Sequence, residues 1–208
     1  MSVKEFEVLA KETVYHGFFR LEQYTLKHTL FRGGWSQPIT RELFRRGNCV
    51  AVLLYDPDRD EVVLIEQFRV GAVYQPQRAW LIEIVAGAIE EGETAEEVAY
   101  RESEEEAGCD IKELIEIQQF YTTPGGCSER ITLFCGRVDS STVGGVHGLT
   151  EEDEDIHVTA VKFADVFQML EDGKIESGIP IIAIQWLYIH RDKLRMRWLN
   201  ATASTPNM

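Results

Sequence analysis

The segment Thr94–Ala107 constrains the fold most, because its sequence predicts both ends and one packed face of a helix. Thr94 and Glu97 fit a capping box, in which each residue satisfies a backbone amide of the first turn. Gly108 fits the left-handed position that ends a helix. An apolar stripe predicts that the helix packs on a sheet, and it consists of Ala95, Val98 and Ala99.

The other face of this predicted helix is acidic. Glu102, Glu105 and Glu106 stand at positions i, i+3 and i+4, so they share one face and repel one another. Between Glu90 and Glu106 there are nine acidic residues and a single basic one, Arg101. A solvated acidic surface is the ordinary interpretation of such a run. A bound divalent cation explains this one better, because carboxylate oxygens are the ligands that Mg²⁺ and Mn²⁺ prefer.

The remaining segments predict a sheet for this helix to pack against. Val50–Tyr55 and Glu61–Phe68 are apolar and β-branched, and the turn residues between them predict a hairpin. Further strands are expected at Trp80–Val85, Ile131–Val138 and Ile156–Phe163, and further helices at Ala164–Glu171 and Ile181–Leu199. This order predicts an α/β (α+β) sandwich around one mixed sheet. Residues 1–47 are expected to form a small β-rich unit before a catalytic domain at residues 48–208.

Charge and composition exclude several classes of protein. The net charge of -14 disfavours nucleic acid and anionic membranes as partners. Four cysteines without CxxC spacing are expected to be free thiols in a reducing compartment. The longest apolar run, Cys49–Tyr55, is far shorter than the ~20 residues of a membrane helix, and the first residues lack the apolar region of a signal peptide. We therefore expect a cytoplasmic protein.

The acidic helix and the residues before it resemble the Nudix box, GX5EX7REUXEEXGU. Each of the seven fixed positions of that motif is met, by Gly87, Glu93, Arg101, Glu102, Glu105, Glu106 and Gly108. The departures are Ser103 and Cys109, which occupy the two aliphatic positions. Because the spacing is long and specific, and the expected strand–loop–helix context agrees with it, chance is a poor competitor. The resemblance implies the α/β/α sandwich of the Nudix hydrolases.

The resemblance also implies roles for the residues of the motif. Glu102 and Glu106 would be metal ligands together with the backbone carbonyl of Ala86, and Glu105 would be a further ligand or catalytic group. Glu93, Arg101, Gly87 and Gly108 would have structural roles. The implied cofactor is Mg²⁺, or Mn²⁺, with two or three ions in each site. Such ions polarise a phosphorus centre and lower the pKa of a bound water.

Five further segments are similar to the bacterial ADP-ribose pyrophosphatases within this family: Tyr15–Phe19, Arg41-Glu42, Glu66–Arg69, Thr123–Glu129 and His147–Leu149. This similarity implies a homodimer that exchanges its N-terminal units. The implied substrate-binding residues are Phe18, Phe19, Arg41, Glu42, Arg46, Arg69, Ala88, Thr123 and Glu129.

Each of these substrate-binding roles has a physical reason and a plainer alternative. An aromatic ring such as Phe18 can stack on adenine, but one member of the Phe18–Phe19 pair could be a core residue. A guanidinium such as that of Arg69 can hold phosphate through two bonds, but a single arginine is often only a solvated surface residue. Glu129 could accept hydrogen bonds from a ribose, unless its glycine-rich segment is a simple turn.

A second acidic run, Glu151–Asp155, follows Gly144, Gly145 and Gly148, and we expect it in a mobile loop. Five consecutive acids are usually solvated. The resemblance assigns the general base to Glu152 and a further metal ligand to Glu154, with Glu151 as the rival base. If the segment is extended, the i, i+2 spacing places both on one side.

These assignments predict hydrolysis of a nucleotide sugar, and by resemblance the conversion of ADP-ribose to AMP and ribose 5-phosphate. One alternative is another nucleotide sugar, such as GDP-mannose, or a dinucleoside substrate. The other is a Nudix module that binds ligand without hydrolysing it, which the presence of Glu102, Glu105 and Glu106 disfavours.

Overall fold

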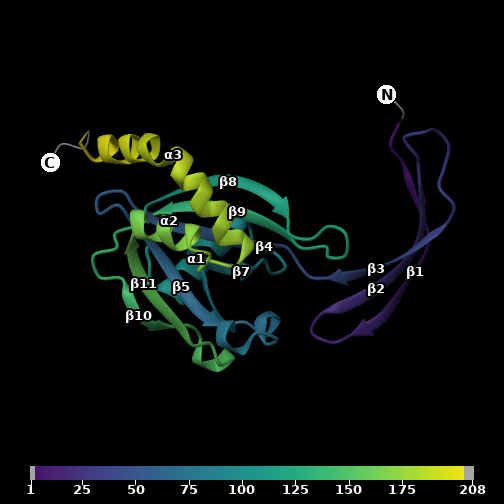
Figure 1. Ribbon diagram of the computed structural model, residues 1–208, viewed down its shortest axis with the longest axis horizontal. Helices are drawn as coiled ribbons and strands as arrows, with labels where there is room; N and C mark the ends of the chain where they lie inside the picture. The colour runs from purple at the N-terminus through teal and green to yellow at the C-terminus, as the bar shows by residue number, and fades with distance from the viewer. Residues whose placement is uncertain (1–2, 204–208) are drawn as a thin grey trace. The chain divides into compact units, whose positions relative to one another are not determined.

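The computed structural model describes residues 3–203, except for the side chains of Glu152 and of residues 200–203. The chain divides into two compact units (Figure 1). The smaller unit contains the residues up to Asn48 together with Phe120–Ile131, and the larger unit contains the rest. Among the helices of the described part, none has the length and apolar character needed to cross a membrane.

The smaller unit is an antiparallel sheet of three strands in the order β1-β2-β3. The strands are β1 (Phe6–His16), β2 (Arg20–His28) and β3 (Ile39–Arg45). Backbone hydrogen bonds from the Phe44 amide to Gly126 and from the Ser128 amide to Phe44 attach the distant loop to β3. This attachment is the reason that residues 120–131 belong to the smaller unit.

The larger unit is built around a mixed sheet in the order β10-β11-β5-β4-β9-β8, and β6 and β7 pair with β5 and β4. Its strands are β4 (Cys49–Asp56), β5 (Glu61–Phe68), β6 (Trp80–Glu83), β7 (Val85–Ala88), β8 (Glu113–Tyr121), β9 (Arg130–Arg137), β10 (Gly144–His147) and β11 (Ile156–Lys162). Its α-helices are α1 (Ala95–Ala107), α2 (Phe163–Glu171) and α3 (Gly178–Ala203).

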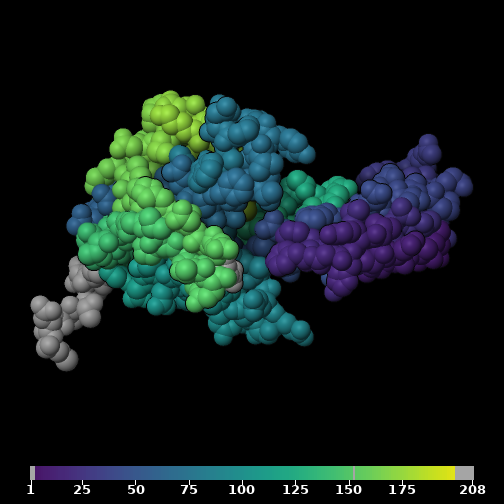
Figure 2. Space-filling view, turned by 90° about the horizontal axis from the view of Figure 1, so that it is seen from below, coloured from purple at the N-terminus to yellow at the C-terminus, as the bar shows by residue number. Residues whose placement is uncertain are grey.

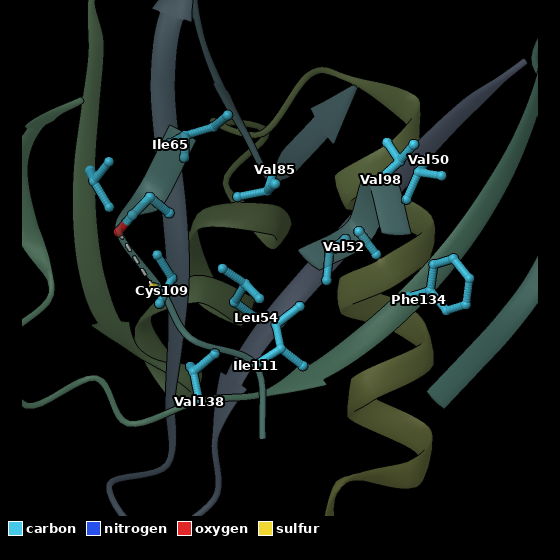
Figure 3. Packing of buried hydrophobic residues seen from close by; sticks show 14 of the residues in the cluster. Val50, Val52, Leu54, Ile65, Val85, Val98, Cys109, Ile111, Phe134 and Val138 are labelled. Carbon is cyan, nitrogen blue, oxygen red and sulfur yellow. Dashed lines mark hydrogen bonds between the residues drawn. The ribbon is translucent and has the colours of Figure 1, made fainter. Parts of the chain in front are cut away.

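Every residue of β4 is buried, and its side chains point alternately to the two faces of the sheet. Val50, Val52 and Leu54 belong to one core cluster with Val98 of α1, and Figure 3 shows these side chains converging. Tyr55 points to the other face, where its ring lies 6.4 Å from that of Trp198 in α3. Because successive strand residues alternate between faces, the sheet lies between α1 and α3. The expected α/β/α sandwich is therefore confirmed.

The strands of the larger unit differ from the expectation at three places, one of which is β8, a strand that was not expected. The other two differences follow from backbone pairing. The expected strand Trp80–Val85 is two short strands that break at Ile84, because β6 pairs with β5 while β7 pairs with β4. The glycine-rich segment before the second acidic run is not wholly a loop, since Gly144–His147 forms β10 and pairs with β11. Glycine hides this strand from a sequence pattern because it has no side chain to alternate.

Candidate active site

The acidic helix α1 begins and ends where its sequence predicts. The Thr94 hydroxyl accepts a hydrogen bond from the Glu97 amide at 3.2 Å, and the Glu97 carboxylate accepts one from the Thr94 amide at 2.8 Å. Gly108 ends the helix at φ +60°, in the left-handed region. The capping box therefore fixes the helix in register, and with it the positions of the three glutamates on its acidic face.

Arg101 lies at the centre of a group of carboxylates. Its Nε atom donates to Glu93 at 3.0 Å, which joins the loop before α1 to the helix. Its Nη1 atom donates to Glu102 at 2.7 Å and to Glu105 at 3.0 Å. A single guanidinium thus pairs with three carboxylates. It orients two of them, Glu102 and Glu105, which are expected to bind metal or to take part in catalysis.

Glu106 is the most buried carboxylate on this face, with 4% of its surface exposed. Its Oε2 atom accepts a hydrogen bond at 2.9 Å from the amide of Ala86, the residue directly before the Nudix-type motif. Its pKa is raised to about 8, mainly by burial and also by the neighbouring carboxylates of Glu102 and Glu154, while the Ala86 amide and Arg69 oppose this rise. Without a counter-ion, ionisation of the Glu106 carboxyl group is therefore unfavourable.

Glu102 lies against the backbone of β7. Burial raises its pKa, and the guanidinium of Arg101 opposes this rise. A Cβ atom built on Gly87 would lie 1.8 Å from the Glu102 carboxylate oxygen. Only glycine leaves room at this point, so the motif glycine allows the helix carboxylate to approach the strand.

These carboxylates fit a divalent cation by the chemistry of their donors. The charge of Glu154 acts on both Glu102 and Glu106, the charge of Glu102 acts on Glu106, and all three side chains offer hard oxygen ligands. Among the described side chains, however, no three acidic, histidine or cysteine groups are already drawn together in metal-binding geometry. The electrostatics and the donor type of these carboxylates thus favour a cation here.

The end of β10 and the residue after it pack on the C-terminal end of α1. A Cβ atom on Gly108 would lie 2.7 Å from the His147 ring, and the Gly148 amide donates to the Glu105 carbonyl at 3.3 Å. The Glu154 carboxylate accepts from the Leu149 amide at 3.3 Å, so it turns back toward the start of this segment. In Figure 2 the green residues of this region lie on the surface of the larger unit.

The second acidic run is not extended, so the condition for the i, i+2 arrangement of Glu152 and Glu154 is not met. Thr150–Glu152 forms a single 3₁₀ turn, and Asp153 adopts a left-handed conformation at φ +54°. A turn redirects the chain at each residue, which removes the alternation of a strand. The side chain of Glu152, the expected base, lies outside the described residues.

Arg69 follows β5 and pairs with a residue that sequence analysis did not single out. Its Nε atom donates to the Glu83 carboxylate on β6 at 2.6 Å. Glu83 is an acidic residue within an otherwise apolar strand, and this contrast is the feature of the sequence that could have identified it. Ala88, another expected substrate-binding residue, lies exposed at the end of β7.

The other expected substrate-binding residues belong to the smaller unit. Arg46 forms an ion pair with Glu129 at 2.9 Å, and its guanidinium lies 5.5 Å from the centre of the Phe19 ring. The backbone carbonyl of Thr123 accepts a hydrogen bond from the Gly126 amide, in the loop that contains Glu129. Arg41 and Glu42 are exposed on β3. Within this unit the structure therefore brings together Arg46, Phe19 and Glu129.

The expected strand geometry of Phe18 and Phe19 is wrong. Residues 17–19 form the bend between β1 and β2, so the alternation of a strand does not apply to them. The two rings pack edge to face with their centres 4.8 Å apart. The centre of the Phe19 ring also lies 5.0 Å from that of Phe44. Phe18 is 96% exposed. An exposed ring held by an aromatic neighbour is suited to stacking on a planar ligand.

Sequence comparisons place this chain near two groups of characterised proteins. The family model described as the NUDIX domain matches residues 45–180. An ADP-ribose pyrophosphatase of Haemophilus influenzae is 46% identical over 200 residues, which cover 95% of this chain and 92% of that protein. An Escherichia coli protein of the same name is 46% identical over 92% of each chain. A GDP-mannose pyrophosphatase of Yersinia pestis is 33% identical over 91% of this chain and 94% of its own.

A comparison with solved structures supports the same fold. The crystal structure described as an ADP compounds hydrolase superposes with a TM-score of 0.68, and the match covers 99% of this chain and 100% of the other. The sequence identity of that pair is 19%, so the likeness concerns the arrangement of strands and helices alone.

Proposed function

The chain belongs to the Nudix family, and on that premise we propose that it hydrolyses ADP-ribose to AMP and ribose 5-phosphate. The observation that carries the proposal is the 46% identity to ADP-ribose pyrophosphatases over almost the full length of both chains. The identity extends through the smaller unit, where substrate-binding residues are expected, and is not limited to the motif around α1.

Nudix hydrolases generally use divalent metal ions. In this chain, Glu102, Glu106 and Glu154 would hold the metal together with the Ala86 carbonyl, and we propose Mg²⁺ or Mn²⁺ as the ion. When bound, it would neutralise the diphosphate and make the phosphorus more electrophilic. The number of ions, two or three, is part of the proposal.

The chain's own residues would position the substrate and move one proton. Glu152 would accept the proton of the attacking water. Glu105, oriented by Arg101 on the acidic face of α1, would assist in this catalysis. Arg69 would bind diphosphate oxygens, with its direction fixed by Glu83. Water adds to one phosphorus, the bridging P–O bond breaks, and the leaving phosphate takes up a proton.

The smaller unit would supply the nucleoside contacts. Phe18 would stack on adenine, and Phe19, Arg41, Glu42, Arg46, Thr123 and Glu129 would line the remaining substrate contacts. We also propose a homodimer in which these N-terminal units are exchanged. The smaller unit carries large exposed apolar side chains, and burial of such surface would stabilise a dimer.

A substrate panel tests the proposed activity. The full chain is incubated with Mg²⁺ and, in parallel, with ADP-ribose, GDP-mannose and a dinucleoside diphosphate, and the products are separated by ion-exchange chromatography. We expect AMP and ribose 5-phosphate in equal amounts, with kcat/KM for ADP-ribose at least about tenfold above that for GDP-mannose. A preference for GDP-mannose would replace the proposal with the second candidate.

GDP-mannose is the second candidate because relatives of that activity match at 33% identity over 91% of this chain. Binding of both nucleotides without product formation would support a ligand-binding module instead. Oligomeric state is measured separately, by light scattering of the full chain, and a monomer would overturn the proposed exchange of N-terminal units.

A further inference from the structure

One side chain in the core of the larger unit has a hydrogen-bonding group without a partner. Among the side chains described within residues 3–203, Nε2 of Gln67 is the buried polar atom that has no hydrogen-bond partner. Gln67 is 7% exposed, although its strand neighbours Glu66 and Phe68 are both exposed. A buried amide that makes no hydrogen bond destabilises a protein by about 1–3 kcal/mol, so such a group calls for an explanation.

The position of Gln67 on β5 determines which way it faces. Ile65, Gln67 and Arg69 alternate with outward residues, so they share one face. Ile65 belongs to the core cluster that packs against α1. Arg69, at the other end of this row, affects the charge of Glu106 on α1. Gln67 therefore lies between the apolar core and the charged residues of the candidate active site.

On the neighbouring strands, the residues opposite Gln67 are apolar. Leu81 of β6 stands directly opposite Gln67. On the other side, β11 pairs His157 with Glu66, and the residue before His157 is the buried Ile156. Glu83 of β6, which stands opposite Ile65, accepts a hydrogen bond from Arg69 and none from Gln67. The direction that remains for a polar contact is away from the sheet, toward the side on which Arg69 and Glu106 lie.

We propose that Gln67 is a substrate-binding residue whose side-chain amide donates a hydrogen bond to a diphosphate oxygen of the bound nucleotide, beside the guanidinium of Arg69. The proposal rests on the proposed function, since it concerns the substrate of the same site. An N–H group requires an acceptor, and an anionic phosphate oxygen is the strongest acceptor that a nucleotide sugar offers. A neutral donor also avoids the repulsion that a further carboxylate would exert on the diphosphate.

The proposal predicts opposite effects on stability and on binding. In Gln67→Met the volume is kept and the unpartnered amide is removed, so the ligand-free protein should be at least as stable as the wild type. Binding should weaken, because the donor to the diphosphate is lost. A structural amide would behave differently, since its removal would lower stability and leave affinity unchanged.

Binding is measured by calorimetry of the full chain with Mg²⁺ and the non-hydrolysable α,β-methylene analogue of ADP-ribose, and stability by thermal unfolding without ligand. For Gln67→Met we expect affinity to fall by about tenfold or more, the usual effect of losing one hydrogen bond to a charged group. Gln67→Glu, of the same length, should bind more weakly still because its carboxylate repels the diphosphate. Gln118→Met, at an exposed position of β8, is the matched control and should change neither property.

An unchanged affinity in a folded Gln67→Met protein would overturn the proposal, and so would a fall in stability without a fall in affinity. If Gln67→Met does not fold, Gln67→Glu decides in its place, and binding equal to the wild type would be contrary to the proposal. The proposed function is tested independently. A wild-type chain that binds the analogue but leaves ADP-ribose intact would refute the hydrolysis, while the Gln67 comparison would still stand.

Discussion

The carboxylate of Glu106 accepts a hydrogen bond from the backbone amide of Ala86 at 2.9 Å. This bond joins the last turn of α1 to β7, two elements that each provide an expected metal ligand. Because the Ala86 amide is occupied by Glu106, the helix carboxylate and the strand carbonyl keep a fixed relation before any ion binds. Because glutamine can keep this bond, Glu106→Gln tests the charge of the side chain without changing its position.

Glu106→Gln should reduce kcat for ADP-ribose by about a hundredfold or more while the fold survives. The amide of glutamine can still accept the Ala86 hydrogen bond, but it removes the charge that a divalent cation requires. Steady-state kinetics at saturating Mg²⁺, with circular dichroism as the check on folding, would measure this. Glu104→Gln, at an exposed position of the same helix, is the control and should retain wild-type turnover. Near-normal turnover of Glu106→Gln would exclude the metal role.

The metal-free protein should lose stability as the pH rises toward 8. Burial raises the pKa of Glu106 to about 8 in the folded chain, above the ordinary value of 4.5. The folded state therefore holds this proton more tightly than the unfolded state. Its contribution to stability is complete below pH 4.5 and is lost as the pH rises through 8.

Thermal unfolding in EDTA, between pH 5.5 and pH 8.5, measures this effect. We expect Tm of the wild type to fall by roughly 7–14 °C more than Tm of Glu106→Gln, whose amide does not titrate. Addition of Mg²⁺ at pH 8.5 should recover the difference, because the ion replaces the proton as the partner of the carboxylate. Parallel curves for the two proteins would contradict the assignment.

Glu152→Gln should lower kcat by about 10²–10⁴-fold, the usual contribution of a general base. Glu151→Gln should change it little, and this neighbouring substitution is the control. The backbone of Thr150–Glu152 is a turn rather than a strand, so the two residues do not have the alternation of neighbouring strand residues. Kinetics with ADP-ribose across pH 6–9 decide between them, and the opposite order of effects would assign the base to Glu151.

Gly87→Ala should destabilise the protein by about 1–3 kcal/mol, because the added methyl group would occupy the position of the Glu102 carboxylate. Activity should fall as well, since Glu102 would have to move from β7. Gly178→Ala is the matched control, because a Cβ atom there meets nothing within 4 Å. Urea unfolding of both variants measures the difference, and equal stabilities would show that Glu102 can move aside freely.

Local signals in the sequence predicted the candidate site better than the sheet around it. The capping box, the ending at Gly108 and the acidic face of α1 are each specified by neighbouring residues, so spacing alone was sufficient for Thr94, Glu97 and the glutamates. The burial of β4 on both faces was likewise visible as a continuous apolar run.

Features that depend on distant partners were not predictable from spacing. The division of Trp80–Val85 into two strands follows from pairing with two different neighbours, and β10 is a strand because β11 lies beside it. The pairing of Arg69 with Glu83 and the buried amide of Gln67 arise from strand register, which is set by the folded sheet. The bend at Phe18 and Phe19 has the same origin.

The complete burial of β4, described above, has a consequence for the motions of the molecule. A strand that is paired on both sides and covered by helices on both faces can expose its amides to solvent only when the whole larger unit opens. The turn at Thr150–Glu152 lies outside the strands and helices of that core, so its amides should exchange with deuterium far sooner. The proposed catalytic loop can therefore rearrange around a substrate many times while the scaffold beneath α1 remains closed.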